Sequence, residues 1–108
     1  MEEPVADIVI FRRFSDGEVI ALFPALAGDP SGELCLCYSH IGQHGAADYR
    51  AVVQATSAAT SGQYARLAAE LRACGYVLDV RRRASARQRA LRRLNAADYR
   101  ESYRREKP

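Results

Sequence analysis

The sequence predicts an α+β fold, in which a mostly antiparallel sheet of about five strands packs against one helix and a basic helix follows at the C-terminus. Two runs rich in β-branched and aromatic residues flank an Asp-Gly pair near the N-terminus, and this pattern favours a β-hairpin. A sequence typical of a helix start begins at Thr60, and regularly spaced apolar residues follow it. A chain of 108 residues fits one such domain.

The first two strands lie on either side of the Asp-Gly pair. Residues 7–14 (Asp-Ile-Val-Ile-Phe-Arg-Arg-Phe) have the composition of a strand. The second strand covers residues 18–23, and we expect it to end at Pro24, because proline cannot donate a hydrogen bond to a neighbouring strand. Arg12 and Arg13 are interpreted as solvated residues that protect a sheet edge, with phosphate contact as the alternative.

Two further strands are predicted before the helix. Residues 24–33 have the composition of a loop, and residues 34–40 form the third strand. The glycines of residues 42–48 predict a second loop. Residues 49–56 are assigned to the fourth strand, although two alanines weaken the strand pattern there.

The packed helix is predicted from Thr60 to Cys74. Thr60 and Gln63 fit a capping box, in which each side chain binds a backbone amide of the other residue. Gly75 stands where a left-handed C-terminal cap belongs, and residues 76–80 then form the fifth strand. The element order is therefore ββββαβ. The apolar stripe of this helix consists of Tyr64, Leu67, Ala68 and Leu71.

Charge is distributed unevenly along the chain. Residues 1–80 carry five basic and ten acidic side chains, whereas residues 81–108 carry eleven basic and three acidic ones. Such a polarised chain is typical of a protein with an interaction tail. The change in composition near Arg83 predicts an α+β domain over 1–83 and a basic, Arg/Tyr-rich helical tail over 84–108.

The sequence contains no apolar run of the roughly 20 residues that a membrane span requires. The acidic residues that follow Met1 are unlike a signal peptide. The three cysteines are an odd number, which disfavours a disulfide framework and favours a reducing compartment. These features predict a cytoplasmic protein that is not associated with a membrane.

Three blocks of the sequence resemble a known family. The blocks are Phe11–Phe14, Asp16–Pro24 (with Ile-Ala-Leu-Phe-Pro) and Tyr38–Gly45 (with His-Ile-Gly-Gln-His-Gly), and the likeness extends over about residues 7–83. They resemble a family of small uncharacterised bacterial proteins that are often encoded by phages and integrative mobile elements. The resemblance implies a setting, in which a mobile-element protein acts on host nucleic acid or host defence, and it implies no catalytic residue or cofactor.

Four residues within one short segment form a candidate metal site. Cys35, Cys37, His40 and His44 have the number and type of ligands of a closed zinc site. Cysteines two apart on a strand place their sulfurs roughly 6–7 Å apart, whereas zinc requires sulfurs nearer about 4 Å. We therefore expect no zinc and no cofactor, and interpret the cysteines as small buried hydrophobes on either side of Leu36.

The glycine-rich segment that contains His40 and His44 is a second candidate site. With Asp48 and Tyr49 nearby, its imidazoles provide groups for acid–base cleavage of a phosphodiester. Imidazoles four residues apart face each other only on a helix, which the glycines disfavour. We predict a hydrogen-bonded turn with Gln43 and His44 at its surface and no catalytic residue.

The basic tail is predicted to be a helix over residues 85–105. Its apolar stripe consists of Ala86, Ala90, Leu94 and Ala97. The opposite half presents arginines, which match phosphate, and tyrosines, which offer a stacking surface. These predicted contact residues are Arg89, Arg92, Arg93, Tyr99, Arg100, Tyr103 and Arg104. Two alternatives are a solvated helix without a partner and self-association, in which the basic tail binds the acidic body.

These features together predict a small non-enzymatic binding protein. Its partner is expected to be nucleic acid, an acidic host protein, or a host protein that handles nucleic acid, contacted by the basic helix. One alternative is a protein inhibitor of a host defence system, such as an anti-CRISPR protein, acting by protein–protein contact. Another is a small metal- or His-dependent enzyme that uses the Cys/His cluster.

Overall fold

The computed structural model describes residues 5–39 and 43–106, including the side chains other than those of Gln43 and residues 102–106. Within these ranges the predicted α+β class is confirmed, because a mostly antiparallel sheet is combined with helices. The strands are β1 (Asp7–Arg13), β2 (Val19–Ala27), β3 (Cys35–Ser39), β4 (Gln43–Ala47), β5 (Ser57–Ala58) and β6 (Leu78–Arg81). The helices are α1 (Tyr49–Ala55), α2 (Ser61–Ala73) and α3 (Ala86–Glu106).

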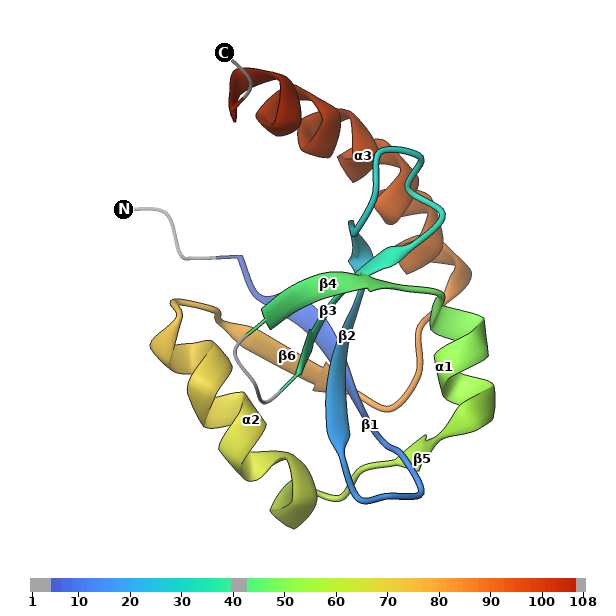
Figure 1. Ribbon diagram of the computed structural model, residues 1–108, viewed down its shortest axis with the longest axis vertical. Helices are drawn as coiled ribbons and strands as arrows, with labels where there is room; N and C mark the ends of the chain where they lie inside the picture. Colours follow the sequence, from blue (N-terminus) through green and yellow to red (C-terminus); the bar gives the residue numbers. More distant parts are fainter. Residues whose placement is uncertain (1–4, 40–42, 107–108) are drawn as a thin grey trace.

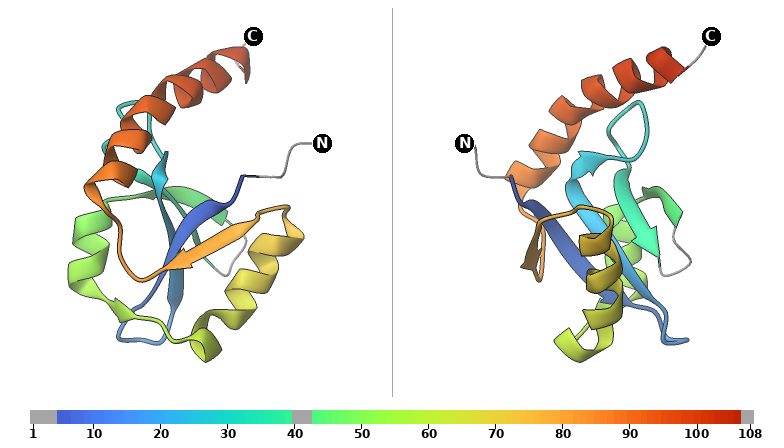
Figure 2. Two further views of the ribbon diagram at one scale, coloured as in Figure 1. Left: turned by 180° about the vertical axis from the view of Figure 1, so that it is seen from behind. Right: turned by 90° about the vertical axis from the view of Figure 1, so that its left-hand side faces the viewer.

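Strand order places β1 inside the sheet. The strands follow the order β4-β3-β2-β1, and both β5 and β6 pair with the outer side of β1. β6 runs parallel to residues 7–10, as the left view of Figure 2 shows, whereas β5 pairs antiparallel with Arg12 and Arg13. The pairs β1–β2, β2–β3 and β3–β4 are antiparallel, which agrees with the predicted mostly antiparallel sheet, and β1–β2 is the predicted hairpin.

Apolar residues line both faces of the sheet, and a helix covers each face (Figure 1). Because side chains alternate along a strand, Val9 and Phe11 point toward α2, whereas Ile10 points toward α1. Leu67 and Leu71 of α2 complete the first cluster, in which the ring of Phe11 also stacks on Tyr64 at 4.3 Å between ring centroids. The apolar content of both faces in the first strand therefore reflects a sheet with two covered sides.

The predicted turn and caps are confirmed. Gly17 has φ +95° in the hairpin, and the amide of Phe14 donates to the carbonyl of Glu18 at 2.8 Å. At the start of α2, Thr60 Oγ1 accepts from the amide of Gln63, and Gln63 Oε1 accepts from the amide of Thr60. These local hydrogen bonds define the boundaries of the first hairpin and of α2.

The segment between β3 and α2 differs from the prediction. Residues 43–47 form β4 instead of a loop, and residues 49–56 contain the helix α1 instead of a strand. Asp48 caps this helix, because its Oδ1 accepts from the amide of Ala51 at 3.1 Å. The alanines that weakened the strand pattern are strong helix formers, and the two valines between them pack on the sheet as part of α1.

Pro24 also does not end β2, which continues to Ala27. The register between β2 and β3 shifts between Phe23 and Ala27, and a proline is tolerated at such an irregularity because no ladder bond is required of it. The consequence is a buried stretch of backbone whose carbonyl groups face the C-terminal helix. Among the described residues, none of the helices is long and apolar enough to cross a membrane.

Candidate nucleic-acid interface

The predicted basic helix is confirmed as α3, and its first half packs against β2 (Figure 1). The predicted apolar stripe is wrong, because Ala86, Ala90, Leu94 and Ala97 are exposed, Leu94 by 72%. The inward face carries Gln88, Arg92, Asn95, Ala96 and Tyr99 instead, which lie within about 100° around the helix axis. A polar face turns inward because the surface below it presents carbonyl oxygens.

Arg92 is the main attachment of α3 to the rest of the domain. Its Nε donates to the carbonyl of Gly32 at 2.8 Å, and its Nη1 donates to that of Pro24 at 3.3 Å. Asn95 Nδ2 donates to the carbonyl of Ala25 at 2.7 Å. Arg92 is only 6% exposed, so the prediction that it contacts a partner is corrected. The helix folds back on its own domain through these bonds to carbonyls.

Three predicted contact residues remain on an exposed flank of α3. Arg89, Arg93 and Arg100 are exposed and lie within about 40° of one another around the helix axis. Arg100 also donates to the carbonyl of Pro30 at 2.6 Å. Tyr99 is half-buried beside this flank. Tyr103 and Arg104 belong to α3, but their side chains lie outside the described part of the structure.

Two hollows that share Tyr49 extend this basic surface toward α1. The first has a volume of about 420 Å³ and is lined by Arg12, Tyr49, Val53, Ala58, Arg82 and Arg83. The second has a volume of about 240 Å³ and is lined by Glu33, Asp48, Tyr49, Arg50, Arg89 and Arg92. Tyr49 Oη accepts from the amide of Ala84 at 2.8 Å, which fixes the connection between β6 and α3 against α1. We call these two hollows together the α1–α3 groove.

Arg12 has a structural partner that the sequence did not reveal. Its Nε donates to Thr56 Oγ1 at 2.9 Å, and its Nη2 donates to the carbonyls of Val53 and Thr56 at 3.0 and 2.6 Å. These acceptors lie at the C-terminal end of α1, where a cation is favourable. Arg12 is therefore half-buried at one wall of the groove and is not a solvated edge residue.

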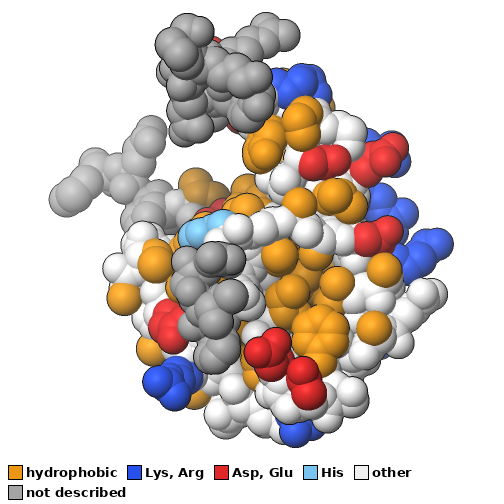
Figure 3. All heavy atoms as spheres, in the orientation of Figure 1, with side chains coloured by type: hydrophobic (Ala, Val, Ile, Leu, Met, Phe, Trp, Pro, Cys, Tyr) orange, Lys and Arg blue, Asp and Glu red, His pale blue; other side chains and the backbone are white. Residues whose placement is uncertain are grey.

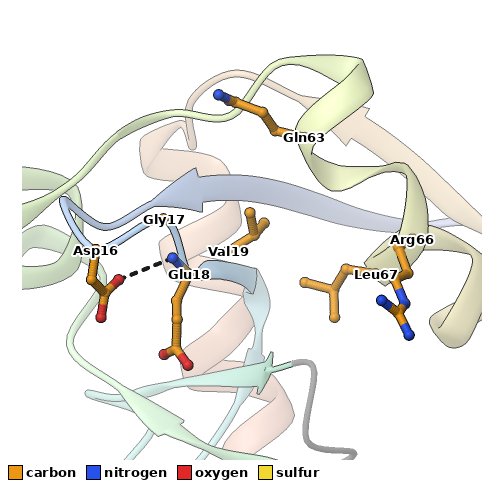
Figure 4. Close-up of a pocket in the computed structure, with 7 residues that line it drawn as sticks. All are labelled: Asp16, Gly17, Glu18, Val19, Gln63, Arg66 and Leu67. Carbon is orange, nitrogen blue, oxygen red and sulfur yellow. Dashed lines mark hydrogen bonds between the residues drawn. The ribbon is translucent and has the colours of Figure 1, made fainter.

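Acidic and basic side chains are interspersed on the surface around these hollows. Figure 3 shows Arg side chains along the edge formed by α1 and α3, with acidic side chains among them. Arg81 pairs with Asp79 through two bonds of 2.9 Å, and the hydrogen bond from Arg81 lowers the pKa of Asp79. A separate hollow of about 370 Å³ lies between the first hairpin and α2, with Asp16 and Glu18 on one side and Arg66 on the other (Figure 4). Its two carboxylates disfavour an anionic ligand.

The Cys/His candidates do not converge. Cys35 and Cys37 lie on the α1 face of the sheet, as the alternation predicts. His44 pairs with Tyr38 on the opposite face, where its Nε2 lies 2.9 Å from Tyr76 Oη. His40 lies outside the described residues, as does the Gln43 side chain. Among the described residues, no three His, Cys, Asp or Glu side chains are grouped as metal ligands would be.

The three cysteines are expected to differ in reactivity toward a thiol reagent such as Ellman's reagent at pH 8. Burial raises the pKa of Cys35 from 9.0 to about 11, whereas Cys74 is exposed at the end of α2. Because the thiolate is the reacting form, Cys74 should react rapidly and Cys35 only after unfolding in guanidinium. Cys74→Ser should remove the rapid phase.

The free energy of unfolding should also fall as the pH rises from about 9 toward 11, where Cys35 ionises only in the unfolded chain.

Comparisons of the chain with family models, curated proteins and solved structures find no match. They therefore do not test the resemblance to proteins of phages and mobile elements, which stays a prediction from the sequence.

Proposed function

We propose that the protein is a small non-enzymatic module that binds nucleic acid at the α1–α3 groove and the arginine flank of α3. The observation that carries this proposal is the convergence of guanidinium groups from four segments of the chain. Arg12, Arg50, Arg82, Arg83 and Arg89 come from β1, α1, the β6–α3 connection and α3, and they all line hollows that share Tyr49. A merely solvated tail does not require such convergence.

The chemistry of these side chains suits a phosphate backbone. Guanidinium groups bind phosphate oxygens through paired N–H donors, and a series of them matches the repeated charges of a polynucleotide. The exposed flank of Arg89, Arg93 and Arg100 continues the same surface along α3. The resemblance described above supports a host nucleic acid as the partner. An acidic host protein is the alternative that presents similar charge.

The proposal is tested by neutralising the α3 flank in the full-length chain. We expect Arg89→Gln/Arg93→Gln/Arg100→Gln to weaken binding of a fluorescein-labelled oligonucleotide by about an order of magnitude at low salt. The slope of log K against log salt should fall by about 2 for a single strand or about 3 for a duplex, at roughly 0.7 or 0.9 per phosphate contact. Fluorescence anisotropy across a salt series measures both quantities.

A matched control carries the same change in charge elsewhere on the molecule. Arg13→Gln/Arg66→Gln/Arg72→Gln removes three charges from the hairpin and α2, and it should leave the affinity nearly unchanged. Equal losses in the two triple variants would contradict the proposed interface, because only net charge would then matter. No binding of any oligonucleotide by the wild-type chain would reject nucleic acid as the partner and favour the protein-inhibitor alternative.

A further inference from the structure

The larger hollow of the α1–α3 groove combines two kinds of wall. Arg12, Arg82 and Arg83 supply cations, and an apolar wall faces the same space of about 420 Å³. This apolar wall consists of Val53, Ala58 and the ring of Tyr49. An inorganic anion would leave the apolar wall exposed to water. An apolar peptide would remove water from the guanidinium groups and offer them no acceptor in its place. A ligand that is both anionic and flat satisfies both walls.

The guanidinium of Arg12 and the backbone that carries Arg82 and Arg83 are held in place before any ligand binds. The bonds of Arg12 to the end of α1 use Nε and Nη2, and none of these three bonds uses Nη1. The backbone of Arg82 and Arg83 is anchored on both sides, and their side chains are exposed. Arg81 pairs with Ile10 in the sheet on one side, and the amide of Ala84 is bonded to Tyr49 on the other. A side chain that is already held, as that of Arg12 is, loses less conformational entropy on binding.

A nucleotide with an unstacked base has the required chemistry. In a duplex the bases are stacked and paired, so a base enters such a hollow only at the cost of unpairing. In a single strand each base has a free face that stacks on an aromatic ring, while its phosphate remains available to arginine. Resting on the proposed function, we infer that this hollow binds one unstacked nucleotide of a single strand. Its base lies against Tyr49, Val53 and Ala58, and its phosphate is bound by Arg82 and Arg83.

The second hollow indicates the path of the bound single strand beyond the first hollow. It shares Tyr49 with the first hollow and carries Arg50 and Arg89, so the next phosphates along the strand meet these two arginines before the rest of the α3 flank. Glu33 and Asp48 line the same hollow and disfavour phosphate close to them. The single strand therefore follows the arginine side of the groove toward Arg93.

The test compares oligonucleotides that differ in whether they offer an unpaired base for the hollow to bind. The probes are a labelled single strand, its duplex, and the same strand with abasic positions, each prepared as DNA and as RNA. We expect the full-length protein to bind the intact single strand about tenfold more tightly than the duplex or the abasic strand, as stacking of one base predicts. The DNA and RNA series show which sugar is preferred, and a preference for either single strand supports the inference.

Two variants separate the apolar wall from the cationic wall. Ala58 pairs with Arg12 and points to the same face, so Ala58→Leu fills the hollow. It should remove the preference for the intact strand while leaving the salt slope unchanged. Arg82→Gln/Arg83→Gln should instead lower the slope by about 0.7, the value for one phosphate of a single strand, because both arginines bind the same phosphate. Ala65→Leu on the exposed surface of α2 is the matched control and should change neither quantity.

The outcomes distinguish this inference from the proposed function. Duplex and single strand bound equally, with binding that still depends on the α3 arginines, would overturn the nucleotide hollow and leave the proposed function standing. An Ala58→Leu protein that unfolds at the wild-type temperature and keeps the full preference for intact strands would also overturn it. If Ala58→Leu fails to fold, the abasic comparison on the wild-type chain and the Arg82→Gln/Arg83→Gln variant decide in the same way.

Discussion

Arg92→Met is expected to lower the free energy of unfolding by about 3 kcal/mol. Methionine fills much of the space of the arginine stem but cannot donate, so the carbonyls of Gly32 and Pro24 lose their bonds to the guanidinium. Each buried acceptor left without a partner costs about 1–3 kcal/mol. For a domain of this size the loss corresponds to a decrease in Tm of roughly 15 °C. Thermal unfolding followed by circular dichroism measures it.

The neighbouring position supplies the control for this substitution. Arg93 lies on the same helix but is exposed, so Arg93→Met should change stability by no more than about 0.5 kcal/mol. The comparison keeps the chemical change and the helix propensity equal and alters only burial. A similar small effect at both positions would show that the carbonyls below α3 are satisfied without Arg92.

Gly32→Ala is expected to cost about 3 kcal/mol, for a different reason. Gly32 has φ +76°, a conformation that alanine adopts only with strain. A Cβ at this position would lie 2.9 Å from Ala96 Cβ and 3.2 Å from Arg93 Cα, both on α3. The loop and the helix must therefore separate, which combines backbone strain with overpacking. Equilibrium unfolding in urea measures the change.

A second glycine provides the contrasting substitution. Gly62 lies in the first turn of α2, and a Cβ there would meet no atom within 4 Å other than its chain neighbours and the nearby backbone of its own helix. Gly62→Ala should therefore stabilise the protein by about 0.5–1 kcal/mol through helix propensity and a less flexible unfolded chain. If Gly32→Ala left the free energy of unfolding unchanged or raised it, as expected for Gly62→Ala, the close packing of this loop on α3 would be contradicted.

Local signals in the sequence predicted the elements that local interactions define. The Asp-Gly turn and the Thr60 capping box are satisfied by residues a few positions apart, so their pattern is visible in the chain itself. The strand prediction for residues 49–56 is wrong because Val52 and Val53 are typical of a strand and outweigh the N-cap at Asp48. The loop prediction for residues 42–48 rests on glycines, one of which, Gly45, lies in β4. Asp48 followed by alanine-rich sequence was the available signal for α1.

The candidate interface was only partly predictable. Arg89, Arg93 and Arg100 share one helix, so the helical period alone placed them together. Arg12, Arg50 and Tyr49 join them through the tertiary fold, and no sequence spacing records that proximity. The exposed flank could therefore be found from one segment, whereas the groove required the packing of α1 beside the β6–α3 connection.

The parallel pairing of β1 with β6 affects how the chain folds as it leaves the ribosome. Residues 10–13 find partners in β2 soon after they are synthesised, but β6 pairs with residues 7–10 on the other side of β1 and is synthesised about 70 residues later. At a synthesis rate of about 5–20 residues per second, that side of β1 lacks its partner for roughly 4–14 s. Ile8 and Ile10 lie on this strand, so the nascent chain passes through a stage in which an apolar edge is open to other nascent chains. When β6 is synthesised, it pairs with this side of β1 and covers the open edge. The helix α3 then packs on a sheet whose strands are all paired.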